Sequence, residues 1–310
     1  MNKKNPLLSI CIPTYNRANF LEGALHNICT DPAFNEEVEI VISDNASIDD
    51  TELIGRKYAN TYTNIHYFRN EKNIKDENFF LALSRGNGKY VKLFNDTLRF
   101  KEGSLSNILK IVTNSFDNCP LFIYSNIDFL SIKNSKAEIN SIDDFVLKSS
   151  FMTTWIANFG CWKKNLNLIQ NPQSCSNLQL AQVDWNYQIV QNSNKSYIYF
   201  NDYYITEPLK NKGGYNIYKV FITNYLTILR SYNISFYILQ KEKYRLLKHF
   251  ISPWYINLSL NEELTFQQGE KWSILFKEYG FHIYFYFFLI YWQIRIFIYK
   301  SKIKLISLFN

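Results

Sequence analysis

Glycine and proline are scarce in this chain of 310 residues, with ten and seven copies, and no glycine lies in the turn after the first apolar run. That turn therefore matches neither a dinucleotide-binding fingerprint nor a phosphate-cradling P-loop. The five cysteines form no C-x-x-C pair and their number is odd, so neither a zinc site nor a disulfide framework is indicated. Reduced thiols in a cytoplasmic protein are the simplest interpretation.

A long apolar run is also missing near the start, where residues 7–12 are too few for the core of a signal peptide. The folded part is therefore expected to stay in the cytoplasm. Hydrophobic residues make up 47% of the chain, which supports a well-filled core and argues against disorder. The formal charge of +7 raises the question of nucleic acid. No recognition-helix, RNP-like or zinc motif is present, so no nucleic-acid partner is predicted.

Residues 7–127 alternate between short apolar runs and helical patterns, which predicts a mostly parallel sheet covered by helices on both faces. We expect strands at 7–12, 38–43, 65–68, 90–94 and 121–125. We expect helices at 20–28, 76–85, 103–112 and 178–190, and a short strand at 197–200. Asn19 followed by Glu22 is typical of a capping box for the first helix. Residues 128–150 are polar and less regular, and 151–162 fit no single pattern.

Five residues with varied chemistry follow the first expected strand: Pro13, Thr14, Tyr15, Asn16 and Arg17. In an open α/β sheet, ligands bind at the carboxyl ends of the strands. A ring, a hydroxyl, an amide and a cation at this position suit a nucleotide.

A second polar turn, with Asp44 and Asn45, follows the second expected strand. The Asp44 carboxylate can accept a hydrogen bond from a base N–H or a ribose hydroxyl. Ser47, Asp49 and Asp50 are interpreted as caps of the next helix. For Asp44 alone, binding and a structural role both remain open.

Together, segments 9–17, 42–47, 68–73 and 88–96 resemble the family 2 glycosyltransferases of GT-A fold. The resemblance is strong over 1–125 and weaker over 151–230, where the chain is similar to abequosyltransferase-like bacterial enzymes of O-antigen and surface-polysaccharide synthesis. It implies a three-layer α/β/α sandwich with a mostly parallel sheet and a helical C-terminal appendage. We therefore expect a catalytic domain over 1–215, with a nucleotide-sugar half at 1–127 and an acceptor half at 128–215, followed by a helical region over 216–310.

The resemblance also implies roles for particular residues. Thr14, Tyr15 and Asp44 would hold the base and ribose of a sugar nucleotide. Asn73 would lie near the ribose or the donor, although Lys75 stands where the family has a glycine.

The fourth strand in that family ends in a metal-binding pair of carboxylates, whereas this chain has Asn95, Asp96 and Thr97. Asp96 is then the one acid that could hold Mg²⁺ or Mn²⁺ against the donor diphosphate. An ordinary strand-to-helix turn is the alternative for this segment.

An inverting transfer needs a base that takes a proton from the acceptor hydroxyl. The resemblance places this role on Asp184, and the alternative is a helix cap. Trp185 is interpreted as a core residue. Lys210 and Lys212 form a cationic loop that could contact the donor phosphates and offset a weakened metal site, with a solvated surface loop as the alternative.

Residues 281–299 are nearly all aromatic and aliphatic, and Lys300, Lys302 and Lys304 follow. The apolar run between His282 and Gln293 is about half of the ~20 residues that span a bilayer. Tyrosine and tryptophan favour the membrane interface, and lysines favour anionic lipid. We expect an interfacial anchor on the cytoplasmic membrane. A core helix or a homo-oligomer interface is the alternative.

The sequence thus predicts an inverting glycosyltransferase. It would move a sugar from a UDP, dTDP or CDP donor to a lipid-linked or oligosaccharide acceptor in surface-polysaccharide synthesis. The rival is a non-catalytic sugar-nucleotide or glycan-binding paralogue that acts as a membrane assembly partner.

Overall fold

A computed structural model describes residues 5–115, 118–125, 135–207, 213–261 and 263–309, with backbone only for 304–309. The chain forms two compact units, 1–208 and 209–310. The boundary therefore falls ahead of the predicted one after residue 215. The reason is that strand β11 (Gly213–Asn216) pairs with β12 (Thr265–Gln267) of the second unit.

The first unit is built on a sheet of five strands in the order β3-β2-β1-β4-β8. The first four run parallel and β8 runs antiparallel to β4. These strands are β1 Leu8–Thr14, β2 Val38–Asp44, β3 Ile65–Arg69, β4 Tyr90–Leu93 and β8 Gly160–Trp162. The predicted strands in this sheet are confirmed to within two residues at each end, and β8 lies in the segment that fitted no single pattern.

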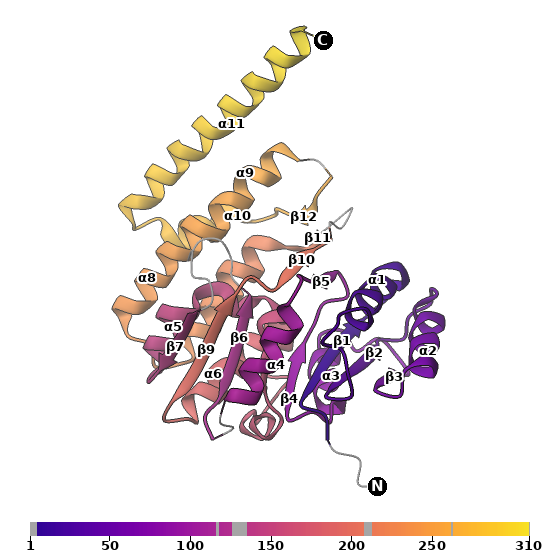
Figure 1. The fold of residues 1–310 in the computed structure, drawn as a ribbon. Coiled ribbons are helices and arrows are strands. Elements are labelled where there is room, and N and C mark those ends of the chain that lie inside the picture. Colours follow the sequence, from indigo (N-terminus) through magenta and orange to yellow (C-terminus); the bar gives the residue numbers. More distant parts are fainter. Residues whose placement is uncertain (1–4, 116–117, 126–134, 208–212, 262, 310) are drawn as a thin grey trace. The chain divides into compact units, whose positions relative to one another are not determined.

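Helices cover both faces of this sheet (Figure 1). The unit's first four helices are α1 Ala18–Cys29, α2 Thr51–Thr61, α3 Glu77–Arg85 and α4 Ser104–Asn114. Ile10 and Ile12 of β1 belong to one buried cluster with Leu25 of α1 and Ile108 of α4. Helix α3 packs against β1, β2 and β4. Because both faces are covered, β1 and β2 are buried along their whole length.

Smaller sheets complete the unit. Strands β6 (Leu121–Ser125), β9 (Ser196–Asn201) and β7 (Ser135–Ile139) form a three-stranded sheet, and β10 (Tyr204–Thr206) pairs with β5 (Leu98–Phe100). Helices α5 (Ile142–Ser149) and α6 (Ala181–Gln191) follow β7 and β8 along the chain. Short 3-10 turns occupy 150–154, 156–158, 163–168 and 176–178.

The predicted capping box of α1 is wrong. The helix begins at Ala18, so Asn19 already lies inside its first turn. The Ala18 N–H donates instead to Asp49 Oδ2 of the neighbouring loop, at 3.1 Å. Glu22 forms an ion pair with Lys57 of α2 at 3.1 Å. The helix start is thus capped by a residue distant in sequence.

The second unit combines the β11-β12 pair with a series of helices. A π-helical segment, 219–224, runs into α7 (Tyr225–Arg230), and a second one, 247–251, joins α8 (Phe236–Leu246) to α9 (Ser252–Leu260). Helix α10 spans Lys271–Tyr279 and α11 spans Ile283–Phe309. An ion pair between the partly exposed Arg230 and the buried Glu278 ties α7 to α10.

Candidate functional site

The carboxyl ends of β1, β2 and β3 bring three predicted loops to one edge of the sheet. In register, Thr14 of β1 lies opposite Asp44 of β2, and Asp44 lies opposite Arg69 of β3. Pro13 is buried one step back along β1, opposite Ser43. Since parallel strands all end on the same side, this edge is where a ligand is expected in an open α/β sheet.

Hydrogen bonds from backbone N–H groups to side-chain oxygens join the first two loops into one surface. Asn16 adopts a φ of 51°, in the left-handed region that asparagine tolerates better than most residues. Its N–H donates to Ser47 Oγ at 2.9 Å, and its Oδ1 accepts from the Ile48 N–H at 2.8 Å. Tyr15, which directly precedes Asn16, is 42% exposed. Ser47 therefore braces the first turn, in place of the helix-capping role predicted for it.

Asp44 is completely buried and organises its own loop. Its Oδ1 accepts from the Ser47 N–H at 2.9 Å, and its Oδ2 accepts from the Tyr67 hydroxyl at 2.6 Å. Burial and the neighbouring Asp44 carboxylate raise the pKa of Tyr67, so this hydroxyl stays a donor. Arg69 lies 3.8 Å from the same carboxylate and is one-third exposed. In this arrangement Asp44 shapes the loop. Arg69, which sequence reasoning missed, braces the same loop, because its Nη2 donates to the Ser47 carbonyl at 2.8 Å and its Nε pairs with Glu52 at 3.0 Å.

Asn45 and Asn73, both predicted site residues, are hydrogen-bonded to each other. Asn45 Nδ2 donates to Asn73 Oδ1 at 2.9 Å, and Asn45 Oδ1 accepts from the Ile74 N–H at 2.9 Å. Asn73 Oδ1 also accepts from the Lys75 N–H at 2.8 Å. Lys75 has a φ of 52°, which explains why a glycine suits this position. The loop after β3 is thereby fastened to the end of β2.

Asp96 follows β4 and contacts the loop after β1. Its Oδ2 accepts from Thr14 Oγ1 at 2.8 Å, and its Oδ1 pairs with Arg17 Nη1 at 3.0 Å. Burial raises the pKa of Asp96, while Arg17 and Thr14 act in the opposite direction. The side chain of Asp96 is 3% exposed and that of Arg17 is 41% exposed. A buried acid thus holds a cation that reaches solvent.

Arg99 fixes the turn that carries Asp96. Its Nη1 donates to the Asp96 carbonyl at 3.0 Å, and its Nη2 forms an ion pair with Glu207 at 2.8 Å. The Glu207 N–H in turn donates to the Thr97 carbonyl at 2.9 Å. No sequence motif signalled Arg99, because its partners are set by the pairing of β5 with β10.

The residues around Asp96 do not fit a divalent metal in this arrangement. Both Asp96 oxygens already accept hydrogen bonds, and a second cation on Oδ1 would lie beside the Arg17 guanidinium. Asn95 Oδ1 is buried and accepts no hydrogen bond from the described residues, but as a neutral amide oxygen it supplies no charge to balance a divalent ion. Within the described part of the chain, no three or more His, Cys, Asp or Glu side chains gather as a metal site would require.

Asp184 lies in the first turn of α6 and is 6% exposed. Its Oδ2 accepts from Ser174 Oγ and from Gln188 Nε2, each at 2.7 Å. Trp185 is a core residue as predicted: its ring meets Phe80 of α3 edge-on at 5.3 Å between centroids. The Trp185–Phe80 contact sets α6 against α3. Lys210 and Lys212 lie outside the described residues.

The strand order, the loops at the carboxyl edge and the helical cover define a GT-A type α/β sandwich. A family model described as glycosyl transferase family 2 matches residues 9–165, about half of the chain. The chain belongs to this family.

Curated relatives and solved structures agree with that assignment. The chain is 42% identical to abequosyltransferase RfbV of Salmonella typhimurium over 102 residues, which are 32% of this chain and 31% of that protein. It is 29% identical over 120 residues, 37% of this chain and 38% of the relative, to the GalNAc(5)-diNAcBac-PP-undecaprenol beta-1,3-glucosyltransferase of Campylobacter jejuni. The chain thus spans about a third of the length of these relatives.

Two solved structures share the fold at low sequence identity. The structure of S. aureus TarS 1–349 in complex with UDP has a TM-score of 0.58 at 16% identity, over 86% of this chain and 77% of that one. The mannosyltransferase PcManGT of Pyrobaculum calidifontis, in complex with GDP-Man and Mn²⁺, has a TM-score of 0.54 at 15% identity, over 94% of this chain and 87% of that one. These similarities establish the GT-A type fold.

Proposed function

We propose that this protein is an inverting glycosyltransferase that moves a sugar from a nucleoside diphosphate donor to a lipid-linked or oligosaccharide acceptor in bacterial surface-polysaccharide synthesis. The observation that carries the proposal is the polar edge of the sheet. There the loops after β1, β2 and β4 are fastened together, and Tyr15 and Arg17 remain partly exposed.

The donor assignment rests on the chemistry of this edge. A partly exposed tyrosine ring can stack on a base, and an arginine can bind a diphosphate through paired N–H groups. Relatives in fold were solved with UDP and with GDP-Man, which supports the nucleoside diphosphate class. The names of the abequosyl- and glucosyltransferase relatives support a surface-glycan product. We propose UDP, dTDP or CDP as the nucleotide.

Asp184 is the proposed base of the transfer. An inverting reaction takes place in one displacement: the acceptor oxygen bonds to the anomeric carbon, the nucleoside diphosphate leaves with the bonding electrons, and the acceptor proton passes to a base. Ser174 and Gln188 hold one Asp184 oxygen by two hydrogen bonds and fix the orientation of the carboxylate.

The test is turnover of candidate donors, by transfer or by slow hydrolysis, in an Asp184→Asn variant. We expect turnover to fall by about 100-fold or more, since general base catalysis contributes that much. Asp143→Asn is the matched control, because Asp143 lies in the first turn of α5 and should leave turnover unchanged. Wild-type turnover in Asp184→Asn would show that the base is another group. Inversion is checked by NMR of the anomeric product.

The non-catalytic alternative is favoured by one observation, the lone carboxylate at the end of β4. It predicts that nucleotide binds, that no donor is turned over, and that Asp184→Asn changes neither result. Turnover in the wild-type protein would exclude it.

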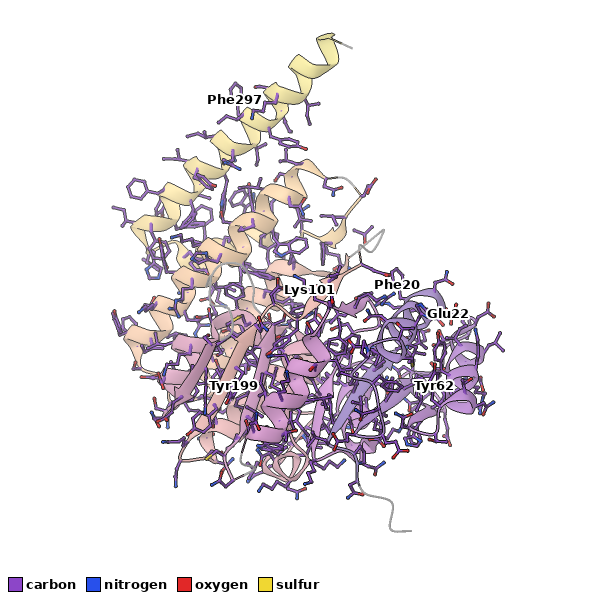
Figure 2. All side chains as sticks on the ribbon, in the orientation of Figure 1. Phe20, Glu22, Tyr62, Lys101, Tyr199 and Phe297 are labelled. Atoms are coloured by element: carbon purple, nitrogen blue, oxygen red, sulfur yellow. The ribbon has the colours of Figure 1, made fainter. Side chains whose placement is uncertain are left out.

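The C-terminal helix supports a membrane-surface location for the proposed reaction. One stripe of α11 is buried within its own unit: Trp292 stacks on Tyr255 at 4.2 Å between centroids, and Phe285 meets Phe276 at 5.4 Å. The opposite stripe is exposed, as for Phe297 in Figure 2. Its members are Ile283, Tyr286, Phe287, Ile290, Tyr291, Ile294, Phe297 and Ile298.

The positive charge of α11 favours an anionic lipid surface as the occupant of this exposed stripe. Arg295, Lys300 and Lys302 are exposed on the same helix, and aromatic rings beside basic residues favour the interface of an anionic bilayer. Among the helices that the structure describes, none has the length and hydropathy needed to cross a bilayer. Binding would therefore be parallel to the surface.

Vesicle flotation of the full chain tests this location. We expect the protein to float with vesicles that contain phosphatidylglycerol and to remain in solution with phosphatidylcholine alone. A Phe287→Glu, Phe297→Glu double variant should lose flotation, whereas Phe236→Glu, at another exposed phenylalanine of this unit, should keep it. Self-association abolished by the double variant, without vesicle binding, would assign the stripe to a homo-oligomer interface instead.

A further inference from the structure

Arg17 is held in place by an acid that lies far away in the sequence. Its Nη1 contacts Asp96 Oδ1 at 3.0 Å, across 79 positions of the chain. Its backbone is fixed as well, because its N–H donates to Thr51 Oγ1 at 3.2 Å and its carbonyl accepts the Leu21 N–H of α1 at 2.9 Å. The guanidinium is therefore oriented from both ends of the residue.

Both carboxylate oxygens of Asp96 have partners in this arrangement. It is almost fully buried, and Thr14 Oγ1 occupies its second oxygen at 2.8 Å. A buried carboxylate of this kind is stable when a cation is paired with it and hydrogen bonds satisfy its remaining lone pairs. Arg17 and Thr14 supply both, so Asp96 has no need of a metal ion for charge balance.

The remaining donors of Arg17 are suited to a diphosphate. A guanidinium carries five N–H donors in a rigid fork that matches phosphate oxygens. The Asp96 contact uses one nitrogen, and 41% of the side chain stays exposed. Arginine is always charged at neutral pH, so the cation is present whatever the metal concentration.

From these contacts we infer that Arg17, positioned by Asp96, binds the donor diphosphate directly and supplies the positive charge that a divalent metal supplies at a two-carboxylate site. Donor binding in this protein is then independent of divalent cations. The inference rests on the proposed function, since it assumes a nucleoside diphosphate donor. In the transfer step, the same guanidinium neutralises the charge that builds on the leaving diphosphate as the bond to the sugar breaks.

The test is calorimetric titration of the full chain with UDP, dTDP and CDP, each in EDTA, in Mg²⁺ and in Mn²⁺. We expect the dissociation constant of the nucleotide that binds to change by less than about threefold between EDTA and metal. Arg17→Gln should weaken binding in EDTA by about tenfold or more, the usual effect of losing a charged hydrogen bond. Arg17→Lys keeps the charge but loses the forked guanidinium, so its nucleotide affinity in EDTA should lie between those of the wild-type chain and Arg17→Gln.

Arg56→Gln is the matched control, since Arg56 is an exposed arginine paired with Glu52 along α2. It should bind as the wild-type chain does. Melting temperatures of all variants separate lost binding from lost folding, and Asp96→Asn should weaken binding without creating a metal requirement. Wild-type binding that disappears in EDTA, or Arg17→Gln binding as tightly as wild type, would overturn the inference while leaving the proposed function standing. No binding of any nucleotide with or without metal would refute both.

Discussion

Lys92 gives the most quantitative prediction, because it is a lysine buried in the middle of the central sheet. It lies on β4, opposite Ile10 of β1, and is 2% exposed. Its Nζ donates to the Ile123 carbonyl at 2.8 Å and to the Ala157 carbonyl at 2.6 Å. Burial lowers the pKa of Lys92 from 10.5 to about 7. Folding therefore favours the neutral amine.

The sign of the pH effect follows from proton counting. Between the folded pKa of Lys92 and its unfolded pKa, the unfolded chain holds the proton and the folded chain releases it, so stability rises with pH. From about pH 6 to about pH 8 the folded state loses most of this proton while the unfolded state keeps it. Over these two pH units the unfolded state binds on average roughly half a proton more than the folded state, which raises the free energy of unfolding by about 1.4 kcal/mol.

Urea denaturation at both pH values measures this effect, and Lys92→Met removes the titrating group at similar length. We expect the unfolding free energy of the wild-type chain to rise by about 1.4 kcal/mol more than that of the variant over this range. Histidines titrate equally in both proteins, so the comparison cancels them. Equal pH dependence in the two proteins would refute the reasoning, since it would mean that Lys92 keeps its proton in the folded state.

Three further predictions concern the start of β4, the Asp44 loop and the donor. Gly88→Ala should lower the unfolding free energy by about 2 kcal/mol or more, because a Cβ there would lie 2.6 Å from the Ser9 backbone nitrogen. Tyr67→Phe should lower the unfolding free energy by about 2 kcal/mol, since the buried Asp44 carboxylate loses a hydrogen-bond donor. Urea denaturation measures the effect of each substitution, and an unchanged denaturation midpoint would contradict the prediction for that variant. Lys210→Ala should weaken nucleotide binding in calorimetry, and unchanged affinity would exclude it from the phosphate site.

Gly269→Ala is the control for the glycine substitution. A Cβ at Gly269 would meet no atom within 4 Å. The free energy of unfolding of Gly269→Ala should therefore differ from that of the wild-type chain by less than about 0.5 kcal/mol. A loss as large as that of Gly88→Ala would indicate a general effect of replacing glycine rather than a clash with Ser9.

The central sheet was predictable because its strands are apolar runs of ordinary length with polar turns between them. Strand β6 was predicted at its exact bounds, 121–125, and the cores of β1 to β4 were located correctly. Strand β7 and helix α5 were missed, since the polar residues of 135–149 carry a weak periodic signal. Strand β8 is three residues long and antiparallel, too short for a sequence pattern to mark it.

By itself, the sequence determined the family, the parallel sheet and the chemistry of the turns after β1, β2 and β4, because these depend on local patterns of apolar and polar residues. Tertiary structure decided what each polar residue does. Asp44 stabilises its loop from a buried position, where it accepts a hydrogen bond of 2.6 Å from Tyr67 of the next strand. Asp96 pairs with Arg17 because β1 and β4 are neighbours in the sheet. Hydrogen bonds and ion pairs depend on distances of a few ångströms between residues tens of positions apart, and only the folded sheet sets those distances.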